Sequence, residues 1–81
     1  MSALQRRTIQ IGNRRTSVKL HPTMWDALEE VAQRQGKTVH DVLISIDRQR
    51  GTTSLATAIR VHIVESLREA LKEGQRRLAE D

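Results

Sequence analysis

Three side chains that can bind an anionic partner alternate along one short stretch of the chain. Arg15, Ser17 and Lys19 stand two residues apart within residues 14–20. Two cations and a hydroxyl can all donate hydrogen bonds, and none of them can fill an apolar core. Because alternate residues of a β-strand face opposite sides, this spacing predicts a strand with one cationic, polar face. The opposite face holds the residues that can pack on a core: Thr16, Val18 and Leu20.

The positive charge of the chain is concentrated at its N-terminal end. Residues 1–20 carry five basic and no acidic side chains, a charge of +5. The other 61 residues carry nine basic and ten acidic side chains, a charge of −1, which gives the net charge of +4. Segregation of this kind indicates an anionic partner that meets one end of the molecule. Nucleic acid is the commonest such partner, and the alternative is a flexible basic tail that keeps the protein in solution.

The remaining polar residues favour neither a catalytic nor a metal site. His21, His40 and His62 do not stand four residues apart, so they do not form the helical histidine pair of a metal site. Three acids have the pattern of a solvated helix face rather than of paired catalytic carboxylates: Asp26, Glu29 and Glu30. No nucleophile, phosphate-binding loop or carboxylate pair can be assembled. The sequence therefore predicts a protein that is not an enzyme and implies no metal or cofactor.

Composition predicts one small domain with an aliphatic core. The chain has 81 residues, a single aromatic residue, Trp25, and no cysteine. A domain of this size has little core of its own and is often completed by dimerisation. Trp25 stands at an apolar helix position and is expected in the core. Without an 18-residue apolar run or a signal-peptide pattern, we expect a soluble cytoplasmic protein that makes no membrane contact.

Two interpretations are open for residues 1–13. Residues 8–11 alternate between polar and apolar types, and the Gly12-Asn13 pair that follows is typical of a two-residue hairpin turn. Such a hairpin would place Ile11 opposite Arg14 and Ile9 opposite Thr16. The alternative is an extended basic arm with a kink at Gly12.

Two helices are predicted after the strand. Apolar residues recur at helical spacing over 23–35, with Pro22 suited to the first helical position and Gly36 to the C-terminal stop. The second helix opens at Thr38, which can cap it, with Asp41 three residues later in the manner of a capping box. It fades at residues 47–50.

A third helix is expected from about residue 55 to residue 77. Thr53 or Ser54 can cap it. Its apolar stripe is clear as far as Leu71, and we expect the charged segment beyond Gly74 to be frayed.

The order of these elements resembles the ribbon-helix-helix (MetJ/Arc-like) DNA-binding domain. The segments that carry the resemblance are Thr16-Ser17-Val18-Lys19-Leu20, then Pro22 to Gly36, then Lys37 to Leu43. With residues 14–17 ahead and 51–71 behind, the chain is similar to a bacterial subfamily that has an extra C-terminal helix. The expected division is a basic arm or extra β-strand over 1–13, a ribbon-helix-helix core over 14–50 and a C-terminal helix over 51–81.

The resemblance implies a mainly α fold with a short β-ribbon, in which two chains of a homodimer pair their strands antiparallel. In this family the ribbon lies in the major groove of DNA, which is about 12 Å wide. By position, Arg15, Ser17 and Lys19 would face base edges, and Arg15 is the best suited to guanine. Phosphates would be held at the start of the second helix and by nearby cations: Lys37, Thr38, Val39, His40, Arg14 and, from a loose arm, Arg6 and Arg7.

The function implied is a dimeric, sequence-specific DNA-binding protein, a transcriptional repressor. Its partners would be double-stranded DNA and a second copy, with a higher oligomer or a protein partner reached through the third helix. The alternative is a protein-interaction module of antitoxin or adaptor type. If residues 8–11 pair with the outer edge of each strand, a dimer would hold a four-stranded sheet. At about 4.8 Å per strand, that sheet is too broad for ordinary insertion into the major groove.

Overall fold

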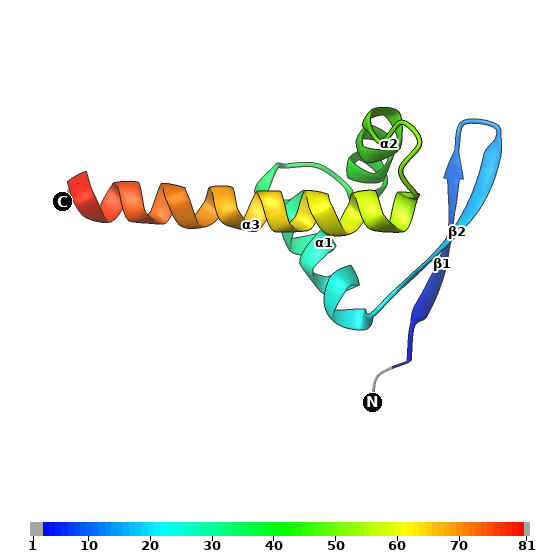
Figure 1. Cartoon of the computed structure of the whole chain (residues 1–81), viewed down its shortest axis with the longest axis horizontal. Helices are drawn as coiled ribbons and strands as arrows, with labels where there is room; N and C mark the ends of the chain where they lie inside the picture. The colour runs from blue at the N-terminus through cyan, green and yellow to red at the C-terminus, as the bar shows by residue number, and fades with distance from the viewer. Residues whose placement is uncertain (1–2, 81) are drawn as a thin grey trace.

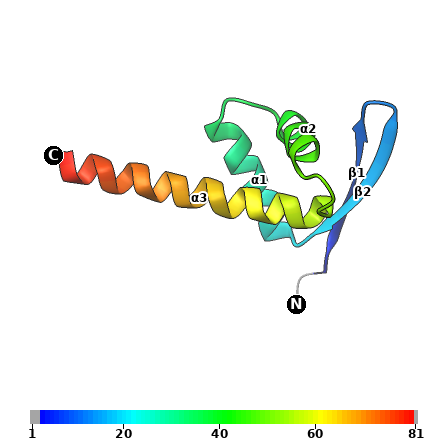
Figure 2. The same cartoon turned by 45° about the horizontal axis from the view of Figure 1, so that its top comes forward.

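The structure, a computed structural model, describes residues 3–80 as a two-stranded antiparallel sheet followed by three helices (Figure 1). The elements are β1 (Gln5–Ile11), β2 (Arg14–Leu20), α1 (Pro22–Arg34), α2 (Val39–Gln49) and α3 (Leu55–Glu80). The hairpin stands at one end of the helical part, and the C-terminal half of α3 projects from the other end (Figures 1 and 2). No helix of the described residues is both long enough and apolar enough to span a bilayer.

β1 and β2 form a hairpin around the Gly12-Asn13 turn. Ile11 pairs with Arg14 and Ile9 with Thr16, which confirms the hairpin register and shows the loose-arm interpretation to be wrong. Gly12 has a φ of 60°, a left-handed conformation that tight hairpin turns require and glycine adopts without strain. The ribbon seen here is therefore made within one chain. Strand pairing between two chains stays a prediction.

The core lies between the inner face of the hairpin and the three helices. The strands contribute Ile9, Val18 and Leu20, which are at most 7% exposed. The helices contribute an almost wholly aliphatic set: Trp25, Leu28, Val31, Ala32, Val42, Leu43, Ile46, Ile59 and Ile63. The alternation within each strand thus turns one face to this core and leaves the other face to solvent.

Trp25 fixes the start of α1 against β1. It is 1% exposed, as its place in the apolar pattern predicted. Its indole Nε1–H donates a hydrogen bond to the backbone oxygen of Gln5 at 2.9 Å. The Arg7 guanidinium lies 4.4 Å from the centre of the ring, a cation–π contact. One aromatic side chain therefore joins the first strand to the first helix.

The helix starts follow the predicted caps. Pro22 opens α1, and Gly36, with a φ of 67°, follows its end. Thr38 Oγ1 accepts from the Asp41 N–H at 3.1 Å at the start of α2. Ser54 Oγ accepts from the Thr57 N–H at 3.2 Å at the start of α3.

The end of α3 differs from the prediction. The helix continues through Gly74 to Glu80 instead of fraying. Except for Gly74, residues 71–80 are good helix formers, and Glu73 lies four residues before Arg77, an order that stabilises a helix. Arg34 of α1 also pairs with Glu73 at 3.2 Å. One helical glycine costs only about 1 kcal/mol, which is too little to end a helix that its neighbours favour.

Candidate nucleic-acid interface

The outer face of the hairpin carries only polar side chains, three of them cationic and none acidic. The members of this outer face are Arg6, Thr8 and Gln10 of β1 with Lys19, Ser17 and Arg15 of β2, in three cross-strand pairs. All six are exposed. The three residues predicted to read bases therefore lie together. β1 adds three more, which were not predicted to read bases. The alternation of residues 8–11, carried along β1 by the hairpin register, was the signal for them.

Arg6 and Lys19 stand directly opposite each other at the open end of the ribbon. Like charges at directly opposed strand positions lower the stability of a sheet. No acidic side chain lies between them on this face. An anion bound on the outer face would remove the repulsion, so the arrangement favours an anionic ligand.

Arg15 is held in place by its cross-strand neighbour. Its Nε donates to Gln10 Oε1 at 3.3 Å, and Gln10 Nε2 donates to the Gly12 backbone oxygen at 2.7 Å. No residue of the described chain accepts from the two terminal nitrogens of Arg15. In the bidentate recognition of guanine, arginine donates hydrogen bonds to the base edge through these two nitrogens. Next along the ribbon, the Thr8 and Ser17 hydroxyls lie 3.4 Å apart.

The start of α2 lies beside this ribbon. His40 Nε2 is 2.7 Å from the Gln10 backbone oxygen, and because a carbonyl only accepts, the imidazole donates here. The Asp41 N–H donates to the Thr38 side chain, which caps the helix. The backbone N–H groups of Val39 and His40 donate to no acceptor within residues 3–80. Free amides at a helix N-terminus bind phosphate well. Exposed Lys37 precedes them.

Two of the cations assigned to phosphate binding are held in ion pairs. Arg14 Nη2 lies 2.9 Å from Asp47 Oδ2, and Arg7 Nη1 lies 3.3 Å from Glu29 Oε1 while its guanidinium covers Trp25. Both tie the hairpin to helices. Arg6 instead lies on the outer face, so the unpaired positive charge of the ribbon comes from Arg6, Arg15 and Lys19.

Asp47 is the centre of a small ion-pair network behind the ribbon. Its other oxygen accepts from Arg50 Nε at 2.8 Å. This hydrogen bond, together with the charges of Arg14 and Arg50, holds the pKa of Asp47 below its ordinary value, although partial burial opposes the shift. The carboxylate is thus ionised where β2 and α2 meet.

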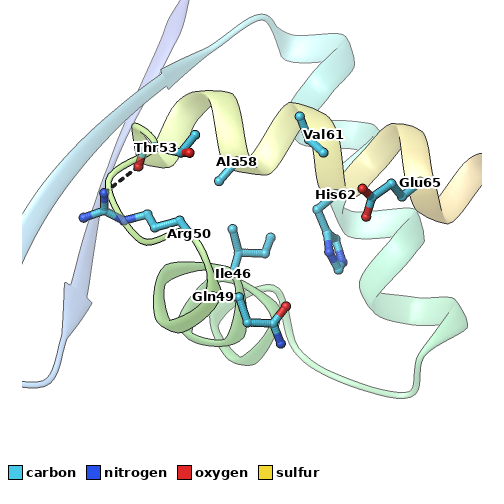
Figure 3. Close-up of a pocket in the computed structure, with 8 residues that line it drawn as sticks. All are labelled: Ile46, Gln49, Arg50, Thr53, Ala58, Val61, His62 and Glu65. Carbon is cyan, nitrogen blue, oxygen red and sulfur yellow. Dashed lines mark hydrogen bonds between the residues drawn. The ribbon is translucent and has the colours of Figure 1, made fainter.

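A groove of about 240 Å³ lies between α2 and α3 (Figure 3). Its apolar lining residues are Ile46, Ala58 and Val61, and its polar lining includes Gln49, His62 and Glu65. Arg50 at its edge is already used, since its Nη1 donates to the Thr53 backbone oxygen at 2.7 Å. No cluster of three potential metal ligands occurs among the described residues. The groove therefore offers apolar contact rather than an anion site.

A two-stranded ribbon with a polar outer face, followed by two helices, defines a class of proteins. The chain belongs to the ribbon-helix-helix domain family, whose family model matches residues 4–67, from the start of the hairpin into the middle of α3. Domains of this family are generally DNA-binding transcription regulators or antitoxins and are typically not enzymes. No curated protein and no solved structure matches the chain.

Proposed function

We propose that the chain is a homodimeric, sequence-specific DNA-binding protein, a cytoplasmic transcriptional repressor that reads the major groove with the outer face of its hairpin. The observation that carries this proposal is the composition of that face. It combines three cations with hydrogen-bonding side chains and has no acid, and it includes the opposed cations Arg6 and Lys19. DNA supplies both the negative charge and the patterned base edges that such a face can bind.

The unit that enters the groove is the hairpin of one chain. Two strands lie about 4.8 Å apart, which suits a major groove about 12 Å wide. If two chains paired through their β2 edges, the outermost backbones of the four-stranded sheet would be about 14 Å apart, too wide for the same insertion. A two-fold dimer would instead place two hairpins on two half-sites.

Within this proposal the side chains divide into readers and anchors. Arg15 binds guanine through its terminal nitrogens, and Lys19 and Ser17 contact neighbouring bases. The anchors bind phosphates: beside the ribbon, the Val39 and His40 amides with Lys37 and Thr38, and at the open end of the outer face, Arg6. Arg7 and Arg14 hold the hairpin on the helices through their ion pairs with Glu29 and Asp47.

Selection of duplexes from a random DNA pool at moderate salt tests the proposal. The wild-type chain should enrich one sequence, and the Arg15→Ala/Lys19→Ala variant should lose that preference while its melting temperature stays close to wild type. Affinity falls as salt rises. A variant that loses one phosphate contact should show a slope of log affinity against log salt that is less steep by about 0.9.

The Arg68→Ala/Lys72→Ala variant is the matched control, because it removes the same charge from the exposed part of α3. It should keep the enriched sequence. A wild-type chain that enriches no duplex, or a control that loses binding as fully as the hairpin variant, would overturn the proposal. An empty selection would favour the second function known in the family, a protein-interaction module of antitoxin type. One observation supports that second function: a row of exposed apolar side chains on α3.

A further inference from the structure

Gln10 of β1 bridges the hairpin turn and the side chain of Arg15 on the neighbouring strand. Its Nε2 donates to the Gly12 backbone oxygen at 2.7 Å, and its Oε1 accepts from Arg15 Nε at 3.3 Å. Gln10 and Arg15 stand directly opposite each other in the hairpin register. The Gln10 amide therefore connects the turn to the side chain assigned to guanine.

Only one orientation of this amide fits both of its partners. The Gly12 backbone oxygen can only accept a hydrogen bond, and the Arg15 Nε–H can only donate one. If the amide were turned over, an oxygen would face an oxygen and an N–H would face an N–H. The two contacts thus fix the Gln10 side chain, and its Oε1 in turn determines where Arg15 Nε lies.

The backbone of Gln10 is fixed at the same point. Its carbonyl oxygen lies 2.7 Å from His40 Nε2, which donates to it, and this bond ties β1 to the start of α2. The side-chain oxygen, the side-chain nitrogen and the backbone oxygen of one residue are therefore all used within the chain. A residue held by the turn and by α2 can keep the long side chain of Arg15 in one place.

The contact at Nε limits how Arg15 can bind a base. A guanidinium can present two parallel donors either from its two terminal nitrogens or from Nε and one of them. Because Gln10 accepts from Nε, the pair of terminal nitrogens remains. Guanine offers two acceptors, O6 and N7, on its major-groove edge, and the terminal pair matches them in an end-on approach.

The same contacts argue against base reading by Gln10 itself. A glutamine that reads adenine uses its amide oxygen and its amide nitrogen together on the base edge. In Gln10 each of these atoms already has a partner within the chain. The geometry therefore favours an action of Gln10 through Arg15.

We infer that Gln10 is a positioning residue, which orients the Arg15 guanidinium for end-on recognition of guanine and does not contact a base. The inference rests on the proposed DNA-binding function and gives β1 a part in base choice. A side chain that is held in place before binding loses less freedom on binding. Gln10 should therefore raise affinity for the guanine-containing site, and not the phosphate-based affinity for other DNA.

Competition binding tests the inference with two duplexes, the enriched one and one in which the guanine read by Arg15 is replaced. Arg15→Ala identifies that guanine by the base position at which preference is lost. Gln10→Met keeps the length of the side chain and removes both of its hydrogen bonds. It should lower the preference for the guanine by about two- to tenfold and leave affinity for the replaced duplex unchanged.

Gln5→Met is the matched control. It makes the same change at an exposed position at the other end of β1, where the cross-strand partner is Leu20. It should leave the guanine preference unchanged. Circular dichroism would verify that both methionine variants keep the wild-type fold.

A double-mutant cycle separates positioning from the alternatives. In the Arg15→Ala background, Gln10→Met should have no further effect on base preference, because the side chain that it positions is absent. If Gln10 read a base, the second substitution would change the preference at another position. If Gln10 acted only by stabilising the hairpin, the second substitution would lower affinity for every duplex.

Hydrogen exchange of the Arg15 Nε–H, followed by NMR without DNA, measures the contact itself. Exchange should be faster in Gln10→Met than in the wild type and unchanged in Gln5→Met. Equal exchange in the wild type and Gln10→Met would overturn the inference. So would full guanine preference in Gln10→Met, or an undiminished effect of Gln10→Met in the Arg15→Ala background.

Failure of the proposed function can be told apart from failure of this inference. A wild-type chain that enriches no duplex would overturn the proposed function, and the base-reading role of Gln10 with it. A wild-type chain that enriches a guanine-containing duplex regardless of Gln10→Met would overturn the inference alone.

Discussion

Arg14 of β2 donates a hydrogen bond to Asp47 of α2 across 2.9 Å, although 33 positions separate them in the sequence. The bond fixes the turn end of the hairpin to the second helix. The next residue, Arg15, points to the other side of the strand and donates to Gln10 on the outer face. Two adjacent residues of the same type therefore serve different purposes, one within the fold and one at the surface that we propose meets DNA.

This difference between neighbours can be measured. Arg14→Ala should lower the free energy of unfolding by about 0.5 kcal/mol, the usual size for a partly exposed ion pair, and should largely preserve base preference. Arg15→Ala should leave stability almost unchanged and abolish preference at one base position. Urea denaturation and duplex selection on both variants provide the comparison. If both variants lose base preference equally, the division of roles is wrong.

The stability contributed by Asp47 should depend on pH. Because its pKa is lower in the folded chain, the ionised carboxylate stabilises the fold fully above about pH 4, the ordinary Asp pKa, and loses this effect as the pH falls through the folded value. Asp47→Asn should therefore lower the melting temperature at pH 7, and its difference from wild type should shrink below pH 4. Asp26→Asn, which removes an exposed acid that has no ion pair in the described chain, should change little at either pH.

Two glycines should respond oppositely to the same substitution. Gly12 has a left-handed φ of 60°, and a new Cβ there would meet no atom within 4 Å. Gly12→Ala should therefore cost about 1–2 kcal/mol through backbone strain alone. Gly74 lies inside α3 with equally open surroundings, so Gly74→Ala should stabilise the chain by up to about 1 kcal/mol. Thermal denaturation of both variants measures the two signs, and a destabilising Gly74→Ala would contradict a helix that continues to Glu80.

Trp25 should be hard to replace even by another aromatic residue. Trp25→Phe removes the indole donor to the Gln5 carbonyl and reduces the buried volume, which together should cost about 1–3 kcal/mol of unfolding free energy. Arg7→Ala removes the cation above the ring together with its ion pair to Glu29 and should cost about 0.5–1 kcal/mol. A Trp25→Phe variant that is as stable as the wild type in urea denaturation would show that the indole hydrogen bond adds nothing.

His62 offers a stabilising substitution. Its Nε2 is buried and has no hydrogen-bond partner within the described residues, and such a group lowers stability by about 1–3 kcal/mol. His62→Leu should therefore raise the free energy of unfolding by about 1 kcal/mol. Arg60→Leu, at an exposed position on the same helix, should leave it nearly unchanged. A destabilised His62→Leu variant would mean that the imidazole has a partner in solution.

Local chemistry was sufficient to predict much of this fold. If residues 8–11 form a hairpin, Gly12-Asn13 predicts its register, and Thr38 predicts the start of α2. Both predictions succeed because turn and cap preferences are set by residues that are close together in the sequence. The choice between strand and arm for residues 8–11 was open, since four alternating residues are a short signal. Packing of Ile9 and Trp25 onto the core decides it, and that packing is tertiary.

The sequence predicted which side chains share the outer face of the hairpin. It did not predict which cations form ion pairs and which remain unpaired. Alternation placed Arg15, Ser17 and Lys19 on one side, and the structure keeps them there. The ion pairs of Arg7 with Glu29 and of Arg14 with Asp47 join residues 22 and 33 positions apart. No local pattern reveals which cations such pairs will occupy, so the phosphate-binding set could not be narrowed from the sequence.

The short turn at Gly12-Asn13 also determines when the ribbon forms. Strands joined by two residues can close in about 1–10 μs, in a first-order step whose rate does not depend on protein concentration. A ribbon assembled from two chains must instead wait for a collision. Each newly made chain can therefore form its outer face by itself. Association between chains then determines how many outer faces act together, but not whether an outer face forms.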